Sequence, residues 1–516
     1  MAAAGEWVIR SRRAVTPQGV CPAAVRVRAG RIVAVEPYGA AAAAPAGARA
    51  GAASGVMDGG GAGSETFDAG DAVLMPGLVD SHVHVNEPGR TEWEGFETAT
   101  RAAAAGGITT IADMPLNSIP VTTTPEALAV KAEAAARGAH VDFTLWGGVV
   151  PGNTAALEAM IDAGVPGFKC FLVHSGIDEF PNVVESDLRA AMPILARRGV
   201  PLLVHAELPG PIEAAERARA RADFGADGGG GVVVGGGGGG PMRRYADYLA
   251  SRPAAAEDEA VALVLRLAAE TGCRVHIVHL SSAGALGALA AARARGIAVT
   301  VETCPHYLTF TAEDIPDGAT LYKCAPPIRE GDNRERLWAG LAAGHIDLVV
   351  SDHSPCAPEH KALEAGDYAQ AWGGISSLQL ALPATWTAAR ARGFGLDRLA
   401  AWMCAAPAAL CGLGRRKGAL APGMDADFVV WHPERSFTVA PEQLRFRHAH
   451  TPYEGRTLNG VVEKTFLRGE LVYDAASVDA RAGAGAAAVA DSVDGAAGSG
   501  AAPAPATRGT WLKPVA

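Results

Sequence analysis

Residues 75–120 read MPGLVDSHVHVNEPGRTEWEGFETATRAAAAGGITTIADMPLNSIP, and the rest of the chain is organised around this stretch. The apolar run 73–79 predicts a buried strand, and His82 and His84 follow it with one residue between them. Side chains at positions i and i+2 of an extended backbone point to the same side, so both imidazoles can reach one ion. A lone His-x-His is more often incidental. Here a Gly/Pro turn and a predicted helix at 98–105 follow the pair, as at the C-terminal end of a first barrel strand.

The composition of the 516-residue chain limits its possible partners. A net charge of −10 argues against nucleic acid or an anionic membrane surface. No uncharged apolar run reaches the ~18 residues of a membrane span, and the first residues do not match a secretory signal. The eight cysteines are scattered without a Cys-x-x-Cys pair. They predict reduced thiols in an intracellular, cytoplasmic protein, with endomembrane or peroxisomal association left open.

Both ends of the chain carry strand patterns. Residues 6–36 alternate apolar and polar with turn residues between, and similar patterns return at 422–431 and 457–473. We therefore expect segments 1–74 and 424–474 to combine into one small β-domain, a β-sandwich built from both chain ends.

Between these ends, residues 75–423 alternate strands with helices, which predicts a (β/α)₈ barrel. A doubly wound open sheet is the alternative, but no G-x-G-x-x-G loop follows a strand. Residues 38–66 and 224–241 are Ala/Gly-rich or Gly-rich insertions, and we expect the tail 475–516 to be disordered. The strand candidates are 109–114, 141–149, 167–173, 201–205, 274–280, 298–303 and 346–351.

Polar side chains end several of these predicted strands. Lys169 lies in the apolar run GFKCFL, where a buried lysine needs a partner. Each histidine or aspartate taken singly is more often a core or capping residue, but at the strand ends of one barrel they would converge on one face. Imidazole and carboxylate suit zinc. By spacing, His276 competes with His279 as a ligand. The candidate set is His82, His84, Lys169, His205, His279 and Asp352.

From Pro76 to Asn117, through NEPGRTEWEGFETATRAAAAGGITT and ADMPLN, the chain resembles the cyclic amidohydrolases, a family of dihydroorotases, dihydropyrimidinases (hydantoinases) and allantoinases. The resemblance continues with interruptions to about Asp474. It implies two zinc ions per subunit, bridged by Lys169 after carbon dioxide converts it to N6-carboxylysine, and a homotetramer. By the same resemblance, one ion is held by His82, His84, Lys169 and Asp352, and the other by His205, His279 and Lys169.

Within this family, the allantoinases are most similar. Dihydroorotases carry an arginine for the substrate carboxylate where this chain has Asn86, and its loss removes a charge-assisted contact. The motifs MPLN, KCAPPIR, SDHSPC and AWGGISSLQ also resemble allantoinases. The resemblance implies zinc-dependent hydrolysis of the cyclic amide of (S)-allantoin to allantoate, a step of purine (ureide) breakdown. It makes Asn86, Asn117, Gly374 and Ile375 candidate substrate contacts.

Asp352 has a second expected role. Amide hydrolysis needs a proton to be moved from the attacking water to the departing nitrogen, and a carboxylate at the barrel mouth can carry it. The alternative is that Asp352 acts only as a ligand or capping residue. Two other functions remain open, namely another cyclic amidohydrolase activity (dihydroorotase or hydantoinase) and a non-catalytic assembly protein on the same barrel.

Overall fold

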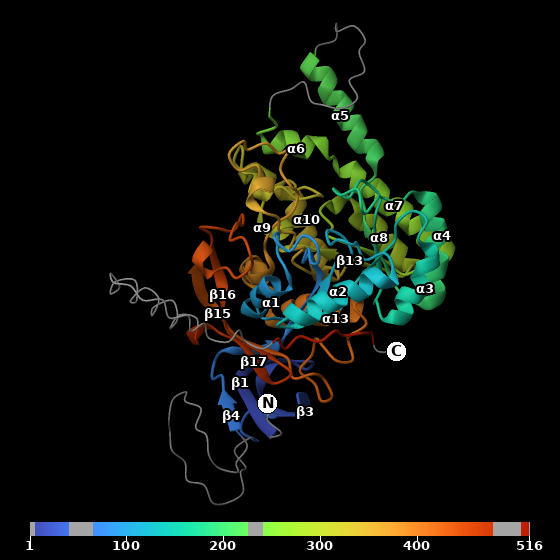
Figure 1. Cartoon of the computed structure of the whole chain (residues 1–516). Coiled ribbons are helices and arrows are strands. Elements are labelled where there is room, and N and C mark those ends of the chain that lie inside the picture. The colour runs from blue at the N-terminus through green and yellow to red at the C-terminus, as the bar shows by residue number, and fades with distance from the viewer. Residues whose placement is uncertain (1–5, 41–64, 225–240, 478–506, 515–516) are drawn as a thin grey trace, which may run out of the picture.

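The computed structural model describes residues 6–40, 65–224, 241–477 and 507–514 (Figure 1). At one end of the molecule both parts of the chain meet in a single eight-stranded sheet. Its order is β17-β16-β15-β5-β1-β2-β3, and β4 pairs with β1. The strands are β1 (Glu6–Thr16), β2 (Gly19–Arg28), β3 (Arg31–Pro37), β4 (Glu65–Asp68), β5 (Val73–Pro76), β15 (Phe428–Thr438), β16 (Thr457–Leu467) and β17 (Glu470–Asp474).

The middle of the chain forms the predicted barrel, whose described strands run parallel in two arcs, β6-β7-β8 and β9 to β14. Only Trp146 separates β8 from β9, and a parallel bridge between Val83 and His353 joins the other ends. The strands are β6 (Leu78–Val83), β7 (Ile108–Asp113), β8 (Asp142–Leu145), β9 (Gly147–Gly148), β10 (Phe168–Phe171), β11 (Leu202–His205), β12 (Val275–Ile277), β13 (Val299–Thr303) and β14 (Leu348–Val349).

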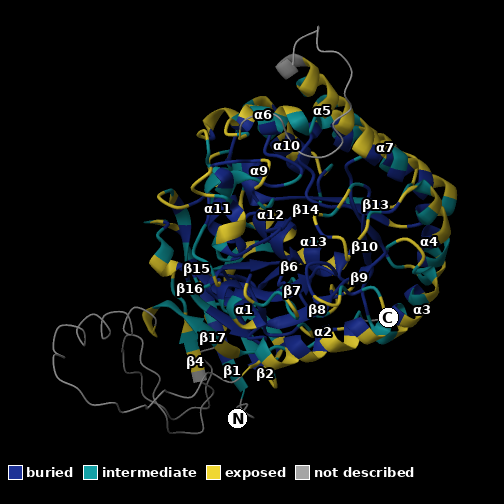
Figure 2. Cartoon of the chain, turned by 45° about the horizontal axis from the view of Figure 1, so that its top comes forward, coloured by how far each residue is buried: buried dark blue, intermediate teal, exposed yellow. Residues whose placement is uncertain are grey.

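Helices surround the barrel, and their exposed faces form its outer rim while the strands lie buried inside (Figure 2). Every residue of β6, β7 and β10 is buried, as expected for parallel strands covered on both faces. Described helices are α1 (Phe96–Ala105), α2 (Pro125–Gly138), α3 (Thr154–Ala163), α4 (Glu185–Arg198), α5 (Pro209–Phe224), α6 (Tyr245–Ser251), α7 (Ala254–Thr271), α8 (Leu286–Ala294), α9 (Pro305–Thr309), α10 (Gly331–Ala342), α11 (Ala381–Arg390), α12 (Leu396–Ala400) and α13 (Ala406–Leu410). Among the described residues, no helix is both long and apolar enough to cross a membrane.

The expected strand 73–79 is in fact two strands that belong to different sheets. β5 pairs with β1 and β15 in the terminal sheet, whereas β6 begins the barrel. The chain passes from one to the other at Gly77, where an added Cβ would lie only 2.3 Å from the Thr109 hydroxyl oxygen. The apolar run is continuous because both strands are buried, so composition alone does not mark the break.

The expectation of a disordered tail at 475–516 is wrong for its last part. Residues 507–514 lie against the barrel, where Thr510 O accepts from Phe143 N (3.1 Å) and Phe143 O accepts from Leu512 N (2.7 Å). Leu512 is buried. The short sequence TWL (residues 510–512) thus pairs with β8 through a parallel bridge between Trp511 and Phe143. Residues 478–506, and most of both predicted insertions, lie outside the described residues.

Candidate active site

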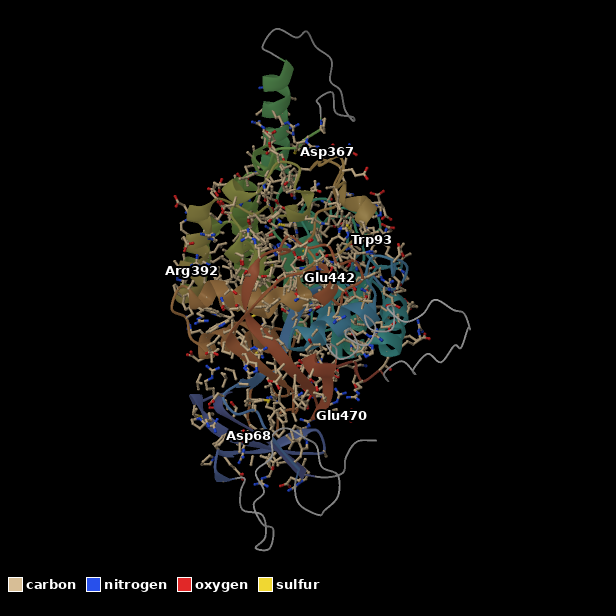
Figure 3. All side chains as sticks on the ribbon, turned by 90° about the vertical axis from the view of Figure 1, so that its left-hand side faces the viewer. Asp68, Trp93, Asp367, Arg392, Glu442 and Glu470 are labelled. Carbon is tan, nitrogen blue, oxygen red and sulfur yellow. The ribbon has the colours of Figure 1, made fainter. Side chains whose placement is uncertain are left out.

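The six predicted ligands come together at the C-terminal ends of the barrel strands. His82 is the second-last residue of β6, Lys169 lies within β10, and His205 ends β11. The other three ligands follow the ends of their strands closely, namely His84, His279 and Asp352. All six are buried and line one cavity of about 1260 Å³. This cavity lies away from the terminal sheet, because its lining residue Asp367 is at the end of the molecule opposite Asp68 and Glu470 (Figure 3).

Side-chain distances connect the six residues into one cluster. Asp352 Oδ1 lies 3.2 Å from His82 Nε2 and 3.6 Å from His84 Nε2. His205 Nδ1 lies 3.0 Å from His279 Nε2. The rings of His82 and His279 link the two halves, with centroids 5.3 Å apart.

Unusual backbone conformations direct several of these residues. His279 (φ 37°), Asp352 (φ 44°), Asn86 (φ 67°) and Asn117 (φ 69°) all lie in the left-handed region, which non-glycine residues seldom adopt. Such conformations persist only where the surrounding structure imposes them, and they concentrate at functional sites. Four of the predicted site residues share this feature.

Lys169 has an unsatisfied amine. It is fully buried, and its Nζ has no hydrogen-bond partner among the described residues. The Nζ atom lies over the ring of Phe171, 5.0 Å from its centroid. Burial lowers the pKa of Lys169 to about 8. The residue therefore cannot be explained as one half of a structural ion pair.

The donor set fits a metal centre. Ligand atoms of His82, His279 and Asp352 all lie within 4.8 Å of one another, and His82 Nε2 makes no hydrogen bond within the described structure. Imidazole nitrogens with a carboxylate oxygen are the donors that zinc prefers. His82 and His279, which the sequence analysis assigned to different ions, meet in this group, so the division of ligands between two ions stays a prediction.

Comparisons with known proteins place the chain in a family. The model of the amidohydrolase family matches residues 73–472. The chain belongs to the amidohydrolase family. It is 51% identical to an allantoinase of Streptomyces avermitilis, over 90% of this chain and 95% of that protein. It is 43% identical to an allantoinase of Arabidopsis thaliana, over 90% of this chain and 87% of that protein.

A solved structure of similar fold supports the predicted architecture. The L-hydantoinase (dihydropyrimidinase) of Arthrobacter aurescens superposes with a TM-score of 0.78 at 32% sequence identity. The match covers 90% of this chain and 96% of that structure. The predicted fold class, a (β/α)₈ barrel with a β-domain from both chain ends, is confirmed, and with it the expected family.

Two glutamates that the sequence analysis missed hold the imidazoles of this amidohydrolase. Glu302 contacts His82 Nδ1 and lies 2.9 Å from His276 Nε2, and Glu207 lies 2.8 Å from His205 Nε2. Although burial raises the pKa of Glu302, the two histidines lower it to about 2. Carboxylates of this kind fix the tautomer and orientation of metal-binding imidazoles. A signal was present, since both are acids at the ends of apolar runs.

His276 is not available as a ligand. Its Nδ1 lies 2.8 Å from Thr300 Oγ1 and its Nε2 is held by Glu302, so both ring nitrogens are engaged. His279, by contrast, directs Nε2 toward His205 and has an Nδ1 without a partner among the described residues. The geometry therefore favours His279 of the two candidates.

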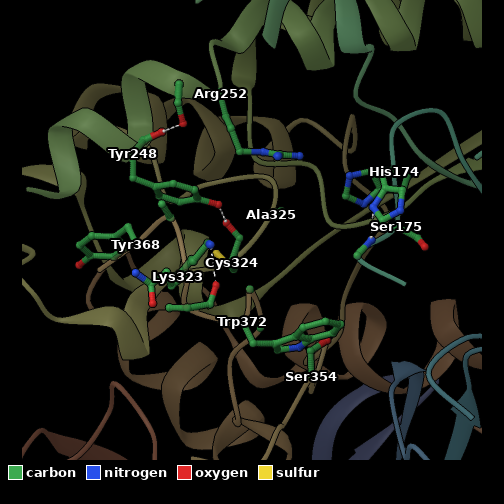
Figure 4. Close-up of a pocket in the computed structure, with 18 of the residues that line it drawn as sticks. His174, Ser175, Tyr248, Arg252, Lys323, Cys324, Ala325, Ser354, Tyr368 and Trp372 are labelled. Carbon is green, nitrogen blue, oxygen red and sulfur yellow. Dashed lines mark hydrogen bonds between the residues drawn. The ribbon is translucent and has the colours of Figure 1, made fainter. Parts of the chain in front are cut away.

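The four predicted substrate contacts divide into two pairs. Asn117 and Gly374 line the cavity. Asn86 and Ile375 are outside its lining: Asn86 donates to Pro355 O (3.1 Å), and Ile375 bridges to His353. Lining residues that the sequence analysis did not single out include Tyr248, Arg252, Lys323 and Trp372 (Figure 4).

Proposed function

We propose that this amidohydrolase is an allantoinase, which hydrolyses the cyclic amide of (S)-allantoin to allantoate in purine breakdown. The observation that carries the proposal is the convergence of six potential ligands on one cavity, with the Lys169 amine unpartnered among the described residues. The choice of substrate is supported by the 43–51% identity to named allantoinases over about 90% of the chain.

We further propose that two zinc ions occupy this centre. His82, His84 and Asp352 would hold one ion, and His205 and His279 the other. Lys169, carrying carbon dioxide as N6-carboxylysine, would bind both. When bound, zinc supplies a nucleophile from water near neutral pH and polarises the carbonyl that is attacked. The buried, partner-free amine of Lys169 is the observation that supports the carbamate.

Asp352 is the proposed proton carrier. Its Oδ1 accepts from Ser354 Oγ (3.0 Å) and lies beside both His82 and His84, so the carboxylate is held at the cavity wall. There it can take a proton from the attacking water and deliver it to the ring nitrogen as the amide bond breaks. A positioned acid–base group contributes about 10²–10⁴ in rate.

Selection of an uncharged ring follows from the residues around the centre. Asn86 stands where dihydroorotases have an arginine, and its amide is turned to a backbone carbonyl. The cavity wall offers the amide of Asn117, whose Oδ1 has no partner among the described residues. Neutral polar groups of this kind suit the hydantoin ring and ureido arm of allantoin.

Purified, zinc-loaded protein should be assayed against allantoin, dihydroorotate, hydantoin and dihydrouracil. We expect kcat/KM for allantoin to exceed each of the others by about tenfold or more, because unmatched polar groups in a site penalise a substrate analogue. Equal or reversed values would contradict the proposal and favour another cyclic amidohydrolase. A protein without turnover and without bound metal would indicate an assembly protein. Family resemblance further suggests a homotetramer, which light scattering can test.

A further inference from the structure

Lys361 is a buried cation without an acidic partner. Its exposed fraction is 4%, and no carboxylate of the described residues lies within ion-pair distance of its Nζ. The ammonium instead donates to Trp372 O (3.2 Å) and to Gly374 O. Buried lysines are rare unless they are paired, and an unpaired buried charge is costly. Burying Lys361 therefore costs folding free energy, and its hydrogen-bond partners are two backbone carbonyls of the cavity wall.

Lys323 reaches the same segment from another direction. Its Nζ donates to Ala371 O (2.5 Å), and its own carbonyl accepts from Gly374 N (2.8 Å). In Figure 4 Lys323 lies on the side of the cavity formed by Tyr248 and Cys324, with His174 and Ser175 across from them. The two lysines thus hydrogen-bond to the backbone of one loop, residues 371–374, from its first residue to its last.

Among the described residues, these contacts leave one N–H and one C=O of the loop unpaired, both of them on Gly373. The carbonyls of Ala371, Trp372 and Gly374 are taken by lysines, and His360 O accepts from Trp372 N (2.7 Å). Gly373, which lines the cavity, has neither N–H nor C=O engaged within the described residues. An added Cβ at Gly373 would meet only Ala325 N, at 3.9 Å, so the space beside it is open.

The neighbouring glycine fixes how close the loop lies to the catalytic side. Gly374 has φ 158°, and an added Cβ there would lie 2.3 Å from Ser354 O. Ser354 in turn donates to Asp352. The loop therefore packs directly against the backbone that follows the proposed proton carrier.

We propose that Lys361 and Lys323 are positioning residues. They hold segment 371–374, which contains or adjoins the substrate contacts Gly374 and Ile375 that the family resemblance implies, so that the N–H and the C=O of Gly373 are both free for the substrate. A cyclic ureide carries the matching N–H and C=O pair, which makes this loop a specificity element for neutral amide rings. The inference rests on the proposed function.

Lys361→Met and Lys323→Met test this proposal, with Glu359→Gln as a control on an exposed residue of the same turn as Lys361. Because the loop affects substrate binding and not the chemical step, KM for allantoin should rise about tenfold in each lysine variant. A tenfold change corresponds to roughly the binding free energy of one lost hydrogen bond. We expect kcat to stay within about threefold of wild type, with metal content unchanged. The control should match the wild type in all three.

Hydrogen exchange supplies a readout that is independent of turnover. In both lysine variants, amide exchange of residues 371–376 should become faster, while the barrel strands and the glutamine control remain unchanged. Unchanged exchange in this segment, or a fall in kcat with unaltered KM, would overturn the proposal. If Lys361→Met does not fold, the half-buried Lys323 provides the decisive variant. If wild-type protein does not hydrolyse allantoin, the proposed function fails, and exchange alone decides whether the lysines hold the loop.

Discussion

Two buried lysines, Lys169 and Lys417, occupy opposite electrostatic environments in the same molecule. Lys417 Nζ contacts three carboxylates, those of Asp427 (2.5 Å), Asp142 (2.7 Å) and Asp425 (3.1 Å). Although burial lowers the pKa of Lys417, these carboxylates raise it above its ordinary value. Lys169 has no such partner among the described residues, and burial leaves its pKa lowered to about 8.

The difference distinguishes a structural cluster from a binding site. The oxygens of Asp142, Asp425 and Asp427 lie close enough together to hold a cation, and Lys417 supplies that cation itself. This cluster joins the barrel strand β8, the start of β15 and the C-terminal segment, since Thr510 N donates to Asp142 (3.0 Å). At Lys169 the pairing is incomplete, and a bound group is needed to complete it.

The largest expected effect is that of Lys169→Ala, which removes the group proposed to bridge both ions. Turnover should fall to the background rate and bound zinc should be lost. Short-chain carboxylic acids, which imitate the carbamate, should restore part of both. Kinetic assays with elemental analysis would check this. Full activity of the alanine variant would show that the lysine is only a buried neighbour.

Asp352→Asn should come next in size. Asparagine keeps an oxygen ligand but cannot carry a proton, so turnover should fall by about 10²–10⁴ while both ions remain bound. Metal content and kcat measured on the same sample separate the two roles of Asp352. Near-normal turnover at full metal occupancy would contradict the proton-carrying role.

Lys417→Met should affect stability instead of chemistry. Asp142 and Asp425 keep Arg468 and Arg416 as partners, but the buried Asp427 loses the lysine with which it pairs, so the free energy of unfolding should fall by about 3–5 kcal/mol. Denaturant titration measures this loss, and the zinc content and kcat of the folded fraction should equal those of wild type. If the folded Lys417→Met protein lost its metal, Lys417 would not be purely structural and the contrast with Lys169 would fail.

The smallest effect is expected from Leu512→Ala in the C-terminal segment that adjoins the Lys417 cluster. Leu512 is buried, so the variant should lose about 2–3 kcal/mol of unfolding free energy, at the low end for a buried leucine because the site lies at an edge. The thermal midpoint should fall and kcat should not change. A midpoint equal to that of wild type would mean that the segment does not remain docked in solution.

Sequence patterns revealed the groups that end apolar strands. His82, His205 and Lys169 each interrupt or close an apolar run, and barrel topology brings such positions to one face. They did not reveal groups whose role depends on distant partners. Glu302 ends an apolar run, but its role as a partner of His82 is visible only in the structure. Lys361 is recognisable only through carbonyls that follow it by more than ten residues.

Two further features could not be predicted because the amino-acid composition does not change where they begin. Gly77 separates two strands within one apolar run because both sheets bury their strands. The docked segment 507–514 follows a long low-complexity stretch, and its few apolar residues carry no periodicity of their own. Both errors arise where long-range pairing, rather than local pattern, decides the structure.

The central claim is that the incomplete pairing at Lys169 marks a two-zinc centre, whereas the complete pairing at Lys417 marks a structural one. A crystal structure of the zinc-loaded enzyme, with anomalous data collected at the zinc edge, tests it most directly. We predict two zinc peaks beside Lys169, a carbon dioxide adduct on its Nζ that contacts both, and no peak near Lys417. An unmodified Lys169 amine with no zinc beside it, or zinc bound among Asp142, Asp425 and Asp427, would contradict the account.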